Sequence, residues 1–379
     1  MPVPFPTESE VNLAPPDLAE TIRNAAGVLS ATRTRDGNSA FQQLLIEATF
    51  EAMTGHHVDT ATLPFVDAAI NAENLRRRAA MYRARMVHMM ILAALVLRPI
   101  PPEVASQVAS YSRELGIDDN LLRVVQEFAS SDTALAAVDF ERNGYTANWS
   151  AERSQVLHAD LQAGWDASEH DAALASRWEA LSELPPGTLG RHVHEFYLAR
   201  GFAVPGSPGS APPLLAQHDW VHVLADYGTS VEAELEVFAL IARANDDPRG
   251  FSLLAMVVSL FETGYLREDA GLFEAFPDQL SRHGMTQRIG DAMRRGALSH
   301  GPDGEPDVDF MQVDWFRFAG LPLDEAARRF GITAKSAKAV AAGTTSPWGP
   351  AGISPTQLAM GQRLAQRLGV PYDSFGATP

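Results

Sequence analysis

The chain has 379 residues, 46% of them hydrophobic and 20% charged, which is enough for two ordinary globular domains. Its formal net charge of −17 disfavours nucleic acid and anionic lipid surfaces as partners, because both are negatively charged. It has no cysteine, which excludes disulfides, thiolate catalysis and cysteine-ligated metal clusters. Any metal site of this chain must therefore be built from His, Asp and Glu.

The beginning of the chain lacks a basic segment followed by an apolar one, so it does not resemble a secretory signal. Residues 1–37 are expected to form a flexible tail, because the first part of this segment is rich in proline and acidic residues. The longest apolar run, at 86–97, is interrupted by His88 and is too short to span a bilayer. We therefore expect a cytoplasmic protein whose contact with the inner membrane is at most peripheral.

From residue 38 onward, apolar residues recur with the period of a helix and predict an N-terminal helical domain over 38–170. Proline and glycine separate its segments, and no stretch alternates long enough to predict a strand. These helices loosely resemble the helical domain of tellurite-resistance TerB-like proteins, although Arg98 and Pro99 replace the acidic turn usual there. The alternative interpretation is an added helical bundle of unknown function.

A second helical region is predicted over 175–343, and a C-terminal extension with one amphipathic helix over 344–379. Both regions show the 3.6-residue period, interrupted by turns rich in glycine and proline. The sequence as a whole therefore predicts an all-α protein.

The segment HDWVH places His218 and His222 four residues apart, so both side chains lie on one face of a helix. Apolar residues share that face, which predicts that the two imidazoles point inward. Gly228 is expected to end this helix, and Thr229 and Glu232 are expected to form a capping box at the start of the next.

On that second helix, Glu234 falls on the apolar face, whereas Glu236 is expected on the side that faces solvent. A buried carboxylate is costly unless it is paired or coordinated. A divalent cation held by the two histidines and by one or two carboxylates would satisfy all of these groups. A buried His–Glu ion pair without metal is the alternative.

The sequence HDxxH, followed by Tyr-Gly-Thr and then by Glu234, resembles the hallmark of the Coq-four family of ubiquinone biosynthesis proteins. Residues 183–202 are similar to the segment that precedes this motif in the family, and residues 314–332 to the family's closing segment. The resemblance covers about 178–333, which is less than half of the chain.

The resemblance implies an all-helical domain with a metal ion, usually zinc, held by His218, Asp219, His222 and Glu234. It also implies a role in coenzyme Q synthesis with a prenylated quinone precursor as hydrophobic ligand. Family members carry out oxidative decarboxylation at C1 of the ring, and they also organise the other biosynthetic enzymes. Two histidines and a carboxylate would suit Fe(II) as well, so the residues leave the metal open.

Three functions remain open from the sequence. The first is a metal-dependent enzyme acting on the ring of a quinone precursor, and the second is a scaffold or lipid-binding protein without turnover. The third is nucleic-acid binding, because residues 323–340 imitate a helix-turn-helix with two lysines in its second helix. The net charge argues against the third, and we expect this segment to pack against the metal-binding domain instead.

Overall fold

The computed structural model describes residues 14–97, 99–117, 171–210, 215–245 and 282–377, together with isolated positions between these ranges (122, 125, 126, 129, 130, 213, 254, 257 and 258). Within them the regular structure is helical, and the β-type pairings are two isolated bridges, Thr34–Gly37 and Thr188–Pro322. The predicted all-α class is thereby confirmed for this part of the chain. None of its helices combines the length and the apolar character needed to cross a membrane.

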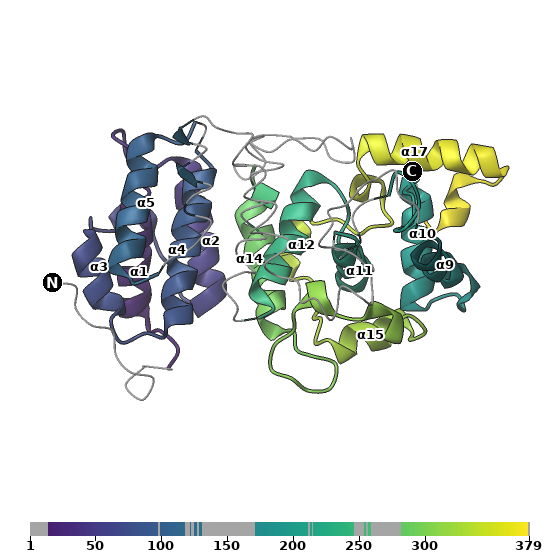
Figure 1. Cartoon of the computed structure of the whole chain (residues 1–379), viewed down its shortest axis with the longest axis horizontal. Helices are drawn as coiled ribbons and strands as arrows, with labels where there is room; N and C mark the ends of the chain where they lie inside the picture. Colours follow the sequence, from purple (N-terminus) through teal and green to yellow (C-terminus); the bar gives the residue numbers. More distant parts are fainter. Residues whose placement is uncertain are drawn as a thin grey trace.

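Five α-helices precede residue 117 and stand side by side at one end of the molecule (Figure 1). They are α1 (Leu18–Ala31), α2 (Ala40–Thr54), α3 (Ala68–Leu75), α4 (Ala80–Leu95) and α5 (Pro102–Glu114), with a short 3₁₀ helix, η2, at Thr60–Thr62. Helix α1 packs against each of the other four, so it is central to this group. The predicted N-terminal helices are therefore present, although residues 131–170 of the predicted domain lie outside the described residues.

Helix α1 corrects the prediction of a flexible tail over 1–37. Asp17 caps it by accepting a hydrogen bond from the Glu20 N–H (2.8 Å), and its inner face is fully buried at Ala25, Ala26 and Val28. The segment of α1 does show the helical period, so the prediction of a tail, which followed from the proline and acidic residues nearer the start, extended too far along the chain. Residues 1–13 lie outside the described residues.

The second part of the chain holds the candidate site and is also helical. Its elements are α9 (Ala172–Glu179), η5 (Ala180–Glu183), α10 (Leu189–Arg200), α11 (Ala216–Ala225), α12 (Val231–Arg243), α14 (Met285–Leu298), η7 (Phe310–Gln312), η8 (Trp315–Arg317), α15 (Leu323–Arg329), α16 (Ala337–Ala341), η9 (Pro350–Gly352), α17 (Pro355–Leu368) and η10 (Tyr372–Phe375).

Helix α14 lies between the two groups of helices, in contact with α2 on one side and α12 on the other (Figure 1). Its close fit to α12 depends on Gly296, because a methyl group there would come within 2.2 Å of the Leu240 carbonyl oxygen. A single cluster of buried apolar residues runs through both groups. The two predicted domains therefore share a continuous core at α14.

The interface of α12 and α14 also corrects the predicted solvent exposure of Glu236. This residue is fully buried, and its Oε2 accepts a hydrogen bond from Nη2 of Arg288 on α14 (2.6 Å). The period of α12 alone could not indicate this, because α14 covers the face that would otherwise be exposed.

The C-terminal extension contains the predicted amphipathic helix, α17, which packs along α10. Gly361 permits the contact, since a methyl group there would lie 2.0 Å from the Ala199 carbonyl oxygen. The Tyr372 hydroxyl donates to the same carbonyl (2.8 Å), and a small separate cluster of apolar residues seals the interface. The extension is thus held against the helix that borders the candidate site.

The segment that imitates a helix-turn-helix packs against neighbouring helices, as expected. Helix α15 contacts α10 and α11, and α16 contacts α14. One of its two lysines, Lys335, is mostly buried and donates to Asp226 Oδ2 (3.1 Å) and to the Thr345 carbonyl (3.0 Å).

Candidate metal centre

The predicted ligands come from two consecutive helices, α11 and α12, joined by a short turn. Helix α11 ends at Asp226, which adopts the left-handed conformation (φ 61°), so the predicted stop at Gly228 is two residues late. Ser230 caps α12, and the predicted capping box of Thr229 with Glu232 is therefore wrong by one residue. This shift leaves the Thr229 hydroxyl available for contacts around the site.

Three of the predicted ligands form a buried group that could hold a metal ion. One potential ligand atom from each of His218, Asp219 and His222 lies within 4.8 Å of the others. The two imidazole rings are 5.0 Å apart, as expected for positions one turn apart on α11. Nε2 of His218 lies 3.6 Å from Oδ1 of Asp219.

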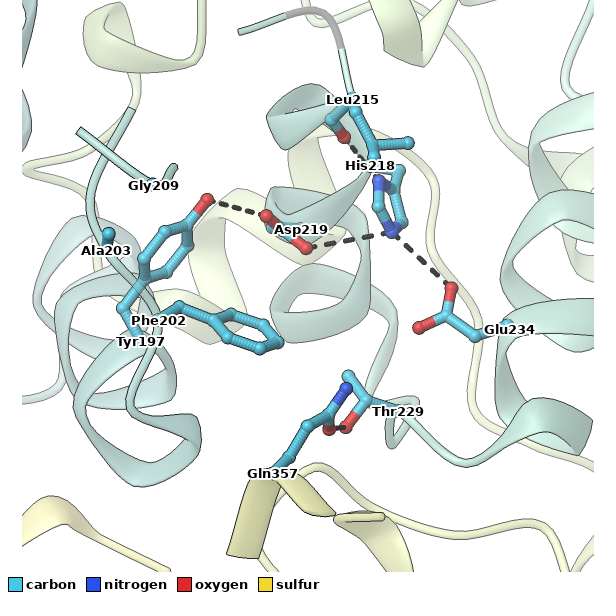
Figure 2. A pocket seen from close by; sticks show the side chains of 10 residues that line it. All are labelled: Tyr197, Phe202, Ala203, Gly209, Leu215, His218, Asp219, Thr229, Glu234 and Gln357. Carbon is cyan, nitrogen blue, oxygen red and sulfur yellow. Dashed lines mark hydrogen bonds and ion pairs between the residues drawn. The ribbon is translucent and has the colours of Figure 1, made fainter. Parts of the chain in front are cut away.

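The structure also brings Glu234 of α12 to both histidines, and Figure 2 shows its contact with His218. Its Oε2 lies 3.4 Å from Nε2 of His218 and 3.2 Å from Nε2 of His222. Burial opposes ionisation of this side chain, but the charges and hydrogen bonds of the two histidines lower the pKa of Glu234 well below its usual range. The residue is therefore a buried carboxylate.

These separations test whether the group suits a metal ion. Zinc lies about 2.0–2.2 Å from nitrogen and oxygen ligands, so neighbouring ligands of a tetrahedral site are about 3.3–3.6 Å apart. The three separations here are 3.2, 3.4 and 3.6 Å. A charge-assisted N–H···O hydrogen bond is shorter, about 2.7–2.9 Å. These separations are compatible with ligands arranged around a cation, and the 3.2 Å contact of His222 with Glu234 is also within ordinary hydrogen-bond distance.

The tautomer of His218 is set by a backbone carbonyl. Its Nδ1 contacts the oxygen of Leu215, and since a carbonyl oxygen can only accept, Nδ1 carries a proton. Nε2 then faces the carboxylates of Asp219 and Glu234. Burial lowers the pKa of His218, but the two carboxylates outweigh it and raise that pKa to about 9. A positive charge, either a proton or a metal ion, is therefore stabilised at this Nε2.

Asp219 is held from its other side by Tyr197 of α10. The tyrosine hydroxyl donates to Oδ2 of Asp219 (2.6 Å), which leaves Oδ1 on the side of His218 (Figure 2). Burial, and then the nearby Asp219, raise the pKa of Tyr197 well above its ordinary value, so the hydroxyl keeps its proton. Burial also raises the pKa of Asp219. The contact resembles the outer hydrogen bonds that orient ligating carboxylates.

Arg200, also on α10, is a fully buried cation close to the centre. Its guanidinium lies 3.6 Å from the ring centroid of Phe196, and that ring stacks on His222 at 5.7 Å. No carboxylate of the described residues lies within 4.0 Å of it; its donors reach Thr229 Oγ1 (2.9 Å) and the Pro347 carbonyl (3.0 Å). Burial lowers the pKa of Arg200 to about 9, which still leaves it charged at neutral pH.

A cavity of about 30 Å³ adjoins the ligand group. Its wall includes apolar side chains such as Phe202 and Leu215 and polar ones such as Thr229 and Gln357 (Figure 2). This volume holds an ion with one or two water molecules, whereas a prenylated aromatic ring is far larger.

Several residues around the centre carry no signal in the sequence. Tyr197 and Arg200 lie on a helix preceding the motif, and Gln357 lies 123 positions beyond Glu234 on α17. Their contribution arises from the packing of α10 and α17, which local periodicity does not encode.

Comparisons of the chain with protein families, with curated proteins and with solved structures find no match.

Proposed function

We propose that the chain is a divalent-metal protein in which His218, Asp219, His222 and Glu234 hold the ion. The observation that carries this proposal is the convergence of two imidazoles and two carboxylates, all buried, beside a cavity with room for an ion. Two carboxylates removed from water are destabilising unless their charge is compensated. A divalent cation compensates both.

The substrate class follows from the motif that resembles the Coq-four family. We propose a prenylated quinone precursor whose ring carboxyl group leaves as CO₂ and is replaced by a hydroxyl, a two-electron oxidation that needs dioxygen or another oxidant. When bound, the ion supplies a Lewis acid that holds a carboxylate or phenolate oxygen of the ring. Zinc would act only as this Lewis acid, whereas Fe(II) could act as the Lewis acid and also take part in the oxidation.

The remaining roles belong to residues of this chain. Leu215 fixes the tautomer of His218 so that Nε2 faces the ion, and Tyr197 orients Asp219. Phe202 and Leu215 form an apolar part of the cavity wall. Arg200 adds positive charge close to the centre, which favours an anionic ring substrate.

A scaffold or lipid-binding function is the second candidate, and the small cavity favours it. A space of about 30 Å³ does not admit a prenylated ring without movement of the surrounding segments. Four protein ligands would also close the coordination sphere, as in structural zinc sites.

Metal analysis and a turnover assay test these proposals together. The purified protein, or the metal-free protein reloaded with Zn(II) or Fe(II), should bind one equivalent of metal. It should then release CO₂ from a prenylated hydroxybenzoate labelled in its carboxyl carbon, in the presence of dioxygen. Metal binding with retention of the lipid but no CO₂ would favour the scaffold. Failure to bind either metal would contradict the metal centre itself.

A further inference from the structure

A chain of three polar side chains leads from the buried Arg200 to the cavity. Nε of Arg200 donates to Oγ1 of Thr229 (2.9 Å), and the Thr229 hydroxyl contacts Oε1 of Gln357 (2.5 Å). All three residues are buried, and both Thr229 and Gln357 line the cavity beside the candidate ligands. The three come from α10, from the turn before α12 and from α17.

The contacts determine which way the Gln357 amide points. Nε of Arg200 can only donate, so the Thr229 oxygen accepts from it. The Thr229 hydroxyl can then donate to Oε1 of Gln357 (2.5 Å) or to the Gly352 carbonyl (3.4 Å), and the contact with Gln357 is the shorter of the two. A separation of 2.5 Å suits an O–H···O bond, whereas an N–H···O bond is typically 2.7–3.2 Å. Oε1 of Gln357 therefore faces Thr229, and the NH₂ group occupies the other side.

That NH₂ group borders the cavity rather than being fully enclosed by protein. Gln357 is only 4% exposed, and among the described residues no acceptor lies within hydrogen-bond distance of its Nε2. Figure 2 shows the amide nitrogen turned toward the part of the pocket that holds Glu234 and His218. Because it faces the cavity, this donor can bond to an oxygen atom of a ligand that enters there.

We propose that Gln357, from the C-terminal segment, donates a hydrogen bond to a carboxylate that binds the metal ion. This inference rests on the proposed metal centre. A divalent ion and the carboxylates of Asp219 and Glu234 cancel in charge, and Arg200 then leaves the site with an excess of one positive charge. A carboxylate neutralises this excess, and it has a second oxygen that can accept from Gln357 while the first binds the ion. The bonds from Arg200 through Thr229 polarise the amide and strengthen that donation.

Cobalt(II) in place of the native ion makes the proposal measurable, because its visible absorption reports the ligands. Formate, the smallest carboxylate, should bind to the cobalt protein and change this spectrum, whereas neutral formamide should bind much more weakly. Gln357→Met keeps the length of the side chain but removes its donors. It should weaken formate binding by about 10- to 100-fold, as expected for one hydrogen bond to a charged group, while cobalt affinity stays the same.

Two further variants serve as controls. Gln362→Met changes an exposed glutamine of the same helix and should leave formate binding unchanged. Gln357→Glu keeps the acceptor for Thr229 but replaces the donor with a negative charge, so it should abolish formate binding even if Gln357→Met is poorly folded.

The failures of the two proposals can be told apart. If cobalt binds and formate affinity is the same in wild type, Gln357→Met and Gln357→Glu, the role of Gln357 is wrong and the metal centre stands. If formate fails to change the wild-type spectrum, the proposal that a carboxylate binds the ion is likewise contradicted. If the wild type binds no cobalt, both proposals fail.

Discussion

Among single residues, Tyr197 has the most direct predicted effect on the centre, because it holds Oδ2 of Asp219 and thereby orients Oδ1. Tyr197→Phe should weaken metal binding about 10- to 100-fold, the usual effect of losing an outer hydrogen bond to a ligand. The affinity is measured by competition with a chelator of known strength. Tyr372→Phe, which removes a hydroxyl that bonds the Ala199 carbonyl instead, is the matched control and should leave the affinity unchanged.

If Tyr197 acts through Asp219, the two substitutions should not be additive. In an Asp219→Asn background, Tyr197→Phe should have little further effect on metal affinity. Full additivity of the two losses would mean that the tyrosine acts on the centre by another route.

Two ion pairs of α12 should differ strongly in how much they contribute to stability. Glu236 and Arg288 are both buried, whereas the Glu232–Arg282 pair lies at the surface. Glu236→Ala leaves a buried guanidinium uncompensated and should lower the free energy of unfolding by about 3–5 kcal/mol. Glu232→Ala should cost no more than about 1 kcal/mol. Urea unfolding of both variants makes the comparison, and equal losses would contradict the burial of Glu236.

At the scale of elements, the position of α17 determines where Gln357 lies. Gly361→Ala would push a methyl group into the Ala199 carbonyl oxygen and force α17 away from α10. We expect a loss of about 1–3 kcal/mol in the free energy of unfolding, as for other overpacked sites. It should be accompanied by weaker formate binding to the cobalt protein. Ala365→Gly serves as the comparison, because it opens space in the same helix and should not displace α17. Gly369→Ala is not suitable, since Gly369 has a positive φ (69°).

The elements also show what the sequence can and cannot predict. The spacing of His218 and His222 and the apolar face around Glu234 correctly predicted that these side chains would meet, because one helical face determines each placement. The end of α11 was placed at Gly228 instead of Asp226, and the cap of α12 at Thr229 instead of Ser230. Gln357 could not be predicted, since only the tertiary packing of α17 on α10 brings it to the cavity.

The same limit applies to whole helices. Helix α1 was missed although its segment shows the helical period, because the proline and acidic residues before it indicated a tail. Helix α17 was predicted within a residue or two of its ends. The burial of Glu236 was missed because it depends on α14. Local pattern thus predicts a helix and its apolar face, but not which helices cover one another.

For the molecule as a whole, the charge of −17 and the packing of α15 and α16 predict weak binding to DNA. Lys335, one of the two lysines of the helix-turn-helix-like segment, is already bonded to Asp226. A gel-shift assay at physiological salt should show affinity no better than nonspecific. Tight binding that depends on the DNA sequence would contradict this prediction, because the segment would have to leave its contacts with α10, α11 and α14.

The central claim, that a metal ion holds His218, His222 and Glu234 together, is tested most directly by melting curves with and without a chelator. A metal that binds only the folded state, at roughly 1,000 times its Kd, adds about 4 kcal/mol to the free energy of unfolding. Chelation should therefore lower the melting temperature of the wild type clearly and that of Glu234→Gln much less. An unchanged wild-type melting temperature on chelation, together with a much less stable Glu234→Gln, would show that the carboxylate serves a structural ion pair and would contradict the metal centre.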